Sequence, residues 1–229
     1  MTRVSVIVEG PAERSFIQQI LAPFLWPFGV YTSAIILGVP GQKGGRTNYP
    51  RVKKDVLRQL SEDRHAYCST MFDFYGLGNG FPGTPLPPNL ANVDKVIHLE
   101  RAMRDDIIAH ASDLRPDVRF IPYLQLHEFE ALLFSDPEAF ATGISEPHLA
   151  GPLRNIRQTF PTPEDINDSS TGAPSKRILG LCRSYNKVLD GTRAAGAVGV
   201  SAMEHECLHF RDWLASLQRT GAPTEYAMP

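Results

Sequence analysis

The sequence of 229 residues lacks a long apolar run, so no segment of it is suited to span a bilayer. Its first residues lack the basic segment, apolar core and small-residue cleavage site of a secretory signal, and nothing indicates export. Cysteine is scarce, with three widely separated residues, Cys68, Cys182 and Cys207. An odd, scattered set excludes a disulfide framework and is typical of reduced thiols in the cytoplasm.

Excess basic charge is also missing, because the formal net charge is -2. A protein with this balance has no global attraction for nucleic acid, although a local basic patch or a metal-bridged contact with phosphates is not excluded by the total. The composition is 42% hydrophobic and 21% charged, which is ordinary for a globular protein.

Strand and helix patterns alternate in the first half of the chain. Apolar, β-branched runs predict strands that end near Val8, Gly38, Phe74 and Leu126, and helices at 16–25, 52–60 and 90–110 lie between them. Pro122 favours an edge or a bulge in the last strand, because it lacks a backbone donor. This order predicts an α/β fold with a parallel sheet and flanking helices. We expect an α/β core over 1–135 and a helical appendage over 136–229 packed on it.

Acidic residues lie at or just after the carboxyl ends of three of the predicted strands. Glu9 follows the first strand, Asp73 ends the third, and Glu128 and Glu130 follow the fourth. The carboxyl ends of parallel strands share one edge of a sheet, where ligands bind. Clustered carboxylates repel one another unless a cation or a proton neutralises them, and Mg²⁺ or Mn²⁺ prefers such oxygen ligands. The pattern therefore predicts a metal site suited to phosphodiester cleavage.

Each acidic residue also has a purely structural interpretation. Glu9 can favour the positive end of the helix that follows it, and Asp73 can serve a turn. Glu128 and Glu130 are ordinary in a first helical turn. If the segment is helical from His127, side chains two positions apart diverge by about 200°, so one of the pair at most reaches the metal. For His127 itself we expect a capping or surface role, with the orientation of a ligand as the alternative.

Five segments together resemble a bacterial domain-of-unknown-function family, family 4276, regarded as TOPRIM-like and related to OLD-type and phage-defence nuclease subunits. They are "VEGPAER", "MFDFYGLG", "HEFEALLFSD", "GAPSKRI" and "CLHFRDWLASL". The first two resemble the two signature motifs of TOPRIM domains, a glutamate after the first strand and an aspartate-containing motif after the third. The resemblance covers nearly the whole chain and implies a TOPRIM-like α/β fold.

The resemblance also implies roles for particular residues. Glu9 takes the place of the TOPRIM glutamate, a metal ligand or general acid/base, and Asp73 that of the first aspartate of the second motif. Glu130 matches the downstream acidic position of related nucleases. Tyr75 replaces the second aspartate of the usual pair, which removes one anionic ligand. Lys176, in "APSKRI", is a candidate catalytic residue, as a phosphate contact or transition-state stabiliser, with a solvated helix-end lysine as its structural alternative.

Two other patterns lack their expected context. His205, Glu206 and His209 satisfy the His-Glu-x-x-His pattern of zinc proteases, but the extension that supplies a third histidine is missing. We therefore expect these two histidines on the final helix without a catalytic zinc. The glycine-rich segment 38–50 lacks the Gly-Lys-Ser/Thr ending of a P-loop, and we interpret it as a loop whose Lys43 and Arg46 contact a nucleic-acid backbone.

The sequence as a whole predicts a metal-dependent nuclease that acts on DNA. The resemblance implies a phage-defence setting and a partner ATPase of the ABC or AAA-like type, and we leave a homo-oligomer open. The main alternative is a TOPRIM-like regulatory or interaction subunit whose metal site has decayed, as Tyr75 would indicate. Zinc proteolysis through His205 and His209 is the third interpretation.

Overall fold

The computed structural model describes residues 1–38, 47–78, 80–167 and 172–222. A parallel sheet lies at its centre, with the strand order β2-β1-β3-β4, and β5 also pairs with β3. The strands are β1 (Thr2–Val8), β2 (Val30–Ile36), β3 (Tyr67–Asp73), β4 (Phe120–Ile121) and β5 (Leu124–Gln125). The predicted α/β class, a parallel sheet with flanking helices, is confirmed.

The predicted fourth strand is interrupted at Pro122, as its missing donor requires. Side chains of β3 bridge the gap. Ser69 donates a hydrogen bond to the carbonyl of Ile121, while the hydroxyl of Thr70 donates to the carbonyl of Tyr123 and accepts from its N–H. Side-chain hydrogen bonds thus replace the ladder at the edge of the sheet.

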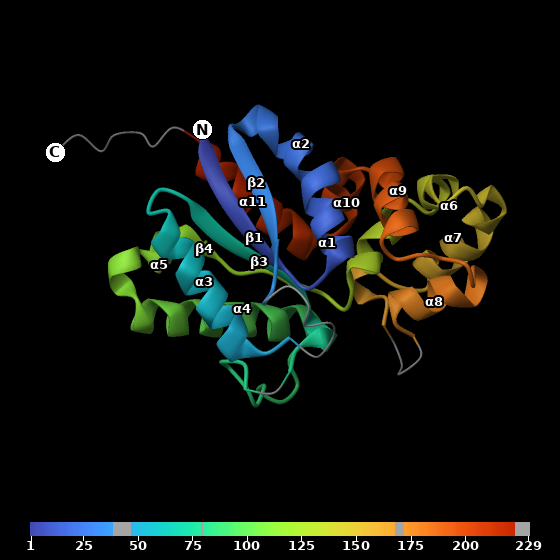
Figure 1. Cartoon of the computed structure of the whole chain (residues 1–229). Helices are drawn as coiled ribbons and strands as arrows, with labels where there is room; N and C mark the ends of the chain where they lie inside the picture. The colour runs from blue at the N-terminus through green and yellow to red at the C-terminus, as the bar shows by residue number, and fades with distance from the viewer. Residues whose placement is uncertain (39–46, 79, 168–171, 223–229) are drawn as a thin grey trace.

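Helices cover both faces of the sheet (Figure 1). On one face lie α3 (Tyr49–Glu62) and α4 (Asn92–His110), which bury Ile7 and Phe72 beneath them. The other face is covered by the continuous helical stretch of α1 (Pro11–Phe16), a π-helix (Ile17–Leu21) and α2 (Ala22–Leu25), and by α11 (Leu208–Gly221). Successive side chains of β1 alternate between the two cores, as a strand buried on both faces requires.

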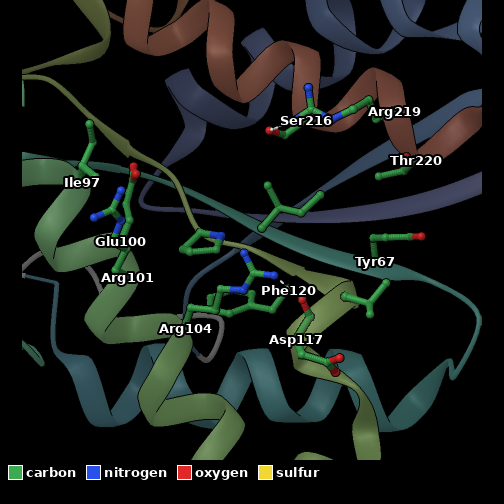
Figure 2. A pocket seen from close by; sticks show the side chains of 13 residues that line it. Tyr67, Ile97, Glu100, Arg101, Arg104, Asp117, Phe120, Ser216, Arg219 and Thr220 are labelled. Atoms are coloured by element: carbon green, nitrogen blue, oxygen red, sulfur yellow. Dashed lines mark hydrogen bonds between the residues drawn. The ribbon is translucent and has the colours of Figure 1, made fainter.

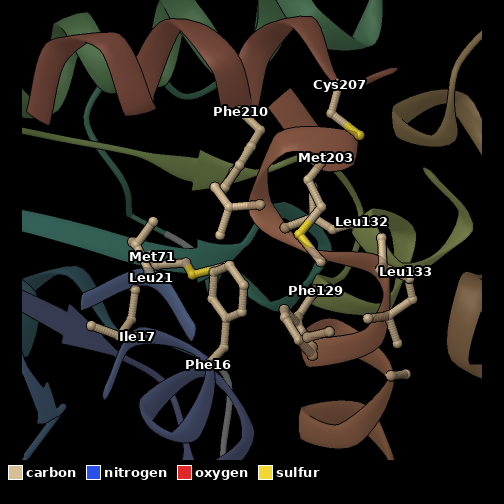
Figure 3. Close-up of a cluster of buried hydrophobic side chains, with 14 of the residues drawn as sticks. Phe16, Ile17, Leu21, Met71, Phe129, Leu132, Leu133, Met203, Cys207 and Phe210 are labelled. Carbon is tan, nitrogen blue, oxygen red and sulfur yellow. The ribbon is translucent and has the colours of Figure 1, made fainter. Parts of the chain in front are cut away.

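The C-terminal helices share a core with the sheet. Figure 3 shows Phe16 and Leu21 of the N-terminal helices and Met71 of β3 in one apolar cluster with Met203 and Phe210. These last two residues lie on α10 (Val200–Glu206) and α11. The C-terminal half is therefore packed on the sheet, while the division at residue 135 stays a prediction.

The remaining helices gather beyond the carboxyl ends of the strands (Figure 1). They are α6 (Pro137–Gly143), α7 (Ala150–Gln158), α8 (Pro174–Leu181) and α9 (Leu189–Val198), and a 3-10 helix over Phe129–Ser135 connects the sheet to them. The short α5 (Pro116–Arg119) precedes β4 at the other end. Within the described ranges, no helix is both long and apolar enough to cross a bilayer.

Candidate active site

Glu9 follows the last residue of β1 and precedes the turn into α1. Its Oε1 accepts a hydrogen bond of 2.5 Å from the hydroxyl of Thr47. Gly76 lies against its other side, where a Cβ atom would come within 3.1 Å of both carboxylate oxygens. Burial raises the pKa of Glu9 above its usual value, while the Thr47 hydrogen bond opposes the rise. The chain thus closes around this carboxylate and fixes its orientation.

Asp73 ends β3 at the same edge of the sheet. Its Oδ1 accepts a hydrogen bond of 3.1 Å from the N–H of Phe129, and its Oδ2 lies 3.6 Å from Nζ of Lys187. Burial raises the pKa of Asp73 well above its usual range. Lys187 lowers it, and the charges of Glu13, Glu9 and Glu130 raise it further. The carboxylates of the site are therefore electrostatically coupled.

Glu128 and Glu130 have different surroundings, because the backbone is extended at residue 128 and turns helical at Phe129. The Oε2 of Glu128 accepts a hydrogen bond of 2.8 Å from the N–H of Ser175 in the first turn of α8, so Glu128 serves that helix. Glu130 is fully buried at the strand ends, and burial raises its pKa. Of the two residues, Glu130 is the one that contacts Lys187, while metal binding by either residue stays a prediction.

Lys187 lies at the centre of the acidic side chains. Its Nζ is 3.3 Å from Oε1 of Glu13, 3.6 Å from Oδ2 of Asp73 and 3.2 Å from Oε2 of Glu130. Although burial opposes its charge, these three carboxylates raise the pKa of Lys187 above its ordinary value. We call Glu9, Glu13, Asp73, Glu130 and Lys187 the strand-end cluster.

Sequence reasoning missed two members of this cluster. Glu13 lies in the first turn of α1, which begins directly after Glu9 and Gly10, and this place at the start of the helix could have indicated that it lies near the same edge. Lys187 lies between α8 and α9 in no recognisable motif, and only tertiary structure brings it to the strand ends. The lysine that was predicted, Lys176, is exposed on α8. Lys43 and Arg46 lie outside the described residues.

The donor chemistry of the cluster fits a hard divalent cation. The described chain contains no three His, Cys, Asp or Glu side chains arranged to hold one metal ion, and an ammonium group lies among the carboxylates instead. Both oxygens of Glu130 are nevertheless buried without a hydrogen bond to any described residue. Unbonded, buried carboxylate oxygens are costly to the fold and are the preferred ligands of Mg²⁺.

His127 is fully buried rather than capping or exposed, which corrects the expectation from the sequence. Its ring stacks on that of Tyr75 with centroids 5.0 Å apart, and its Nδ1 lies 3.3 Å from the side-chain amide of Asn167. Burial lowers the pKa of His127 to about 4. Tyr75, which replaces the second aspartate, therefore covers a neutral imidazole beside the strand-end cluster.

The two histidines of the His-Glu-x-x-His pattern do not form a pair. Helix α10 ends at Glu206, the backbone is extended at Cys207, and α11 starts at Leu208, so the expected single final helix is wrong. His205 is 83% exposed and contacts Glu206, whereas His209 is buried with its Nε2 3.0 Å from Oε1 of Glu100. Two histidines on separate helices cannot form the zinc site of the pattern, which needs them one turn apart on one helix.

Comparisons with known proteins place the chain among relatives. No protein with curated annotation matches it. Among solved structures, it is similar to the C-terminal region of the Xanthomonas campestris pv. campestris OLD protein, with 15% sequence identity and a TM-score of 0.45 over 96% of this chain and 97% of the other. The family model of a domain of unknown function, DUF4276, matches residues 8–218, a range that contains all five segments of the resemblance. The protein belongs to the DUF4276 family.

Proposed function

We propose that the protein is a metal-dependent nuclease that cleaves phosphodiester bonds in DNA. The observation that carries this proposal is Glu130, whose two buried oxygens lack hydrogen bonds among the described residues and which shares the Lys187 ammonium with Glu13 and Asp73. Buried, coupled acids with raised pKa values at the carboxyl edge of a parallel sheet are typical of a reaction centre. The resemblance of the segments around Glu9 and Asp73 to TOPRIM motifs points the same way.

Glu9, Asp73 and Glu130 would hold Mg²⁺ or Mn²⁺. When bound, such an ion polarises a phosphoryl oxygen and lowers the pKa of a bound water. Thr47 and the N–H of Phe129 orient the carboxylates of Glu9 and Asp73 by the hydrogen bonds described above.

Lys187 is the residue we propose as the partner of the phosphate. Its ammonium neutralises three carboxylates in the structure, and its side chain is 40% exposed, so it can contact an incoming phosphate oxygen from the same position. A cation fixed near the developing negative charge stabilises a phosphoryl transition state. We retain Lys176, exposed on α8, as a proposed contact with the DNA backbone farther from the reacting phosphate.

The partner and the setting follow from the charge balance and the resemblance. With a net charge of -2, the chain cannot rely on the phosphate contacts that give most of the affinity of a stand-alone DNA-binding protein. We therefore propose that an ATPase subunit of the ABC or AAA-like type engages the DNA, in a phage-defence system of the cytoplasm. A homo-oligomer is compatible with this proposal.

The test is cleavage of a supercoiled plasmid with Mn²⁺ and the cognate ATPase, by the wild-type protein and by Glu9→Ala. We expect the substitution to abolish nicking, and Glu62→Ala, an exposed glutamate on α3, to leave it unchanged. Nicking by a folded Glu9→Ala protein at the wild-type rate would refute the assignment. The melting curve of each variant, measured without metal, serves as the check on folding.

The alternative function is that of a regulatory or interaction subunit without catalysis. Two observations favour it, namely the ammonium of Lys187 among the carboxylates and Tyr75 at the place of the second aspartate. Calorimetric titration with Mn²⁺ separates the two functions. The nuclease must bind Mn²⁺ saturably and lose that binding in Glu130→Gln, whereas a decayed site binds none at low millimolar concentration.

A further inference from the structure

A cavity lies between α4, α11 and the edge strand β4, far from the strand-end cluster (Figure 2). Its volume is about 530 Å³, and Tyr67 and Phe120 at the beginnings of β3 and β4 form part of its wall. Asp73 stands at the other end of β3, so at about 3.3 Å per strand residue the two sites are roughly 20 Å apart. The cavity thus needs an explanation of its own.

Three arginines line this cavity without a carboxylate partner in the described chain. Arg101 and Arg104 project from α4, and Arg219 projects from α11 on the opposite side (Figure 2). Most other exposed arginines of the protein are paired with an acid, and six examples are Arg3, Arg58, Arg64, Arg115, Arg154 and Arg193. Three guanidinium groups around one cavity, none of them paired with a carboxylate that the structure describes, are suited to bind an anion.

The acids of the cavity wall are already engaged elsewhere. The carboxylate of Asp117 accepts two hydrogen bonds from Arg115. Oε1 of Glu100 accepts one hydrogen bond from the N–H of Leu124 and lies 3.0 Å from Nε2 of His209. Neither carboxylate therefore cancels the charge of the three arginines.

Two of the arginines are held in place. Nη2 of Arg104 donates to the backbone carbonyl of Asp117, and Nη2 of Arg219 donates to Oγ of Ser216 over 2.8 Å. Each guanidinium group has five N–H donors, so both keep free donors for a ligand. Groups fixed before binding lose less side-chain freedom when the ligand arrives.

Size and charge favour a compact ligand over a polymer. A volume of about 300–1,000 Å³ suits a small molecule. The exposed Asp212 lies on α11 beside residues of the same wall, and its negative charge would oppose the phosphates of a nucleic acid that continued past the cavity. Ile97, Ile121 and Pro122 give the wall an apolar part against which a base can pack.

We propose that this cavity binds a small phosphorylated molecule of the nucleoside diphosphate or triphosphate class, with its phosphates on Arg101, Arg104 and Arg219. The shared chemistry is a di- or polyphosphate, and recognition of a base distinguishes a nucleotide from inorganic pyrophosphate. Because the cavity shares no residue with the strand-end cluster, the proposal is independent of the nuclease assignment.

The experiment is calorimetric titration of the full-length protein with ADP, with pyrophosphate and with a single-stranded DNA of about 12 nucleotides. We expect ADP or pyrophosphate to bind with a Kd of about 10–100 μM. Tighter binding of ADP than of pyrophosphate shows that the base is recognised, and equal binding shows a polyphosphate site; both support the proposal. Tighter binding of the DNA than of either small ligand overturns it.

The variants are Arg101→Gln combined with Arg219→Gln, and Arg193→Gln as the control on α9. Arg101, Arg219 and Arg193 are all exposed, and none of the exchanges leaves a buried acid unpaired. The variants should therefore fold. Loss of two charge-assisted contacts should weaken binding by about tenfold or more in the double variant. Unchanged binding in the double variant, or no saturable binding of either small ligand to the wild-type protein, overturns the proposal. Glu130→Gln must leave the binding intact, whatever it does to cleavage.

Discussion

Two regions of the molecule bury acidic side chains in opposite ways. Beneath α11, Glu164 accepts hydrogen bonds of 3.0 Å from the N–H groups of His209 and Phe210, one on each oxygen, and Glu100 is bonded to Leu124 and His209. In the strand-end cluster, Glu130 accepts no hydrogen bond from any residue that the structure describes. Both regions thus bury a glutamate, but only Glu164 accepts a hydrogen bond from described residues on each of its oxygens.

The difference lies in what replaces the water that each carboxylate loses on burial. Removing a carboxylate from water is costly unless hydrogen bonds or charges replace the water. Glu164 regains those interactions at the N-terminus of α11, where a negative charge is also favoured by the helix dipole. Glu130 regains them only in part, from the Lys187 ammonium. Glu130 is therefore the less compensated of the two buried acids.

The largest effect should follow from Asp73→Asn. Asparagine retains the oxygen that accepts from Phe129 but loses the negative charge, so the fold should change little and the metal should bind more weakly. Since metal-assisted charge stabilisation is worth several kcal/mol, cleavage should fall by about 10²-fold or more and recover partly at higher Mn²⁺. A plasmid assay in the presence of the cognate ATPase measures the rate.

Asp136→Asn is the matched control for that exchange. Asp136 caps α6 by accepting from the N–H of Ala139, and asparagine serves equally well as a cap. This variant should cleave at the wild-type rate. Wild-type cleavage by Asp73→Asn as well would reduce Asp73 to a turn residue and leave Glu9 and Glu130 to account for the chemistry.

Much of the sheet could be predicted from the sequence, because its information is local. The apolar runs around Ile7 and Met71 and the glycine and proline residues after them predict the two strands to within a few residues. The π-helix over Ile17–Leu21 and the break at Cys207 were not predictable, since both sit inside apolar patterns of helical spacing and depend on packing against the sheet.

The sequence predicted those residues of the site that lie at the ends of strands. Glu9 and Asp73 lie at one edge because the strands are parallel, which the alternating pattern indicates. Glu128 and Glu130 have different partners because the backbone becomes helical between them, at Phe129. Lys187 comes from a segment distant in the sequence, and no local pattern predicts its position. Tertiary packing decides both.

In the region beneath α11, where the buried acid is fully hydrogen-bonded, Glu164→Ala should destabilise the protein without changing metal binding or cleavage. The exchange leaves two buried N–H groups at the start of α11 without acceptors, which costs about 2–3 kcal/mol of unfolding free energy. Urea unfolding followed by circular dichroism measures the loss, and calorimetry should show unchanged Mn²⁺ binding. An equal loss of Mn²⁺ affinity would erase the distinction between the two regions.

Lys187→Met should have a smaller effect on stability, and one that metal reverses. Without the ammonium, the carboxylates of Glu13, Asp73 and Glu130 repel one another, but the lysine is partly exposed and solvent screens the loss to about 1–2 kcal/mol. Mn²⁺ should restore the melting temperature and bind more tightly than to the wild-type protein, while cleavage falls. Lys53→Met, which breaks the ion pair between Lys53 of α3 and Asp106 of α4, should gain nothing from Mn²⁺.

The smallest effect concerns the two histidines, one beside each group of acids. Burial lowers the pKa of His127 to about 4, whereas the Glu100 carboxylate helps to raise the pKa of His209 against the opposing effect of burial. Between the ordinary histidine pKa and 4, the unfolded chain binds a proton at residue 127 that the folded protein does not. The contribution of His127 to stability is therefore present at neutral pH and lost as the pH falls through that window, while that of His209 is lost as the pH rises.

His127→Asn isolates this effect, because φ at residue 127 is 64° and asparagine tolerates that left-handed conformation. From neutral pH to about pH 5.5, the wild-type protein should lose about 1 kcal/mol of unfolding free energy that the variant retains. Urea unfolding at the two pH values measures the difference, and the NMR signals of the His127 ring should titrate near 4. If the His127 ring titrates at the ordinary histidine pKa, water reaches it. The assignment of a buried, neutral imidazole stacked against Tyr75 would then be wrong.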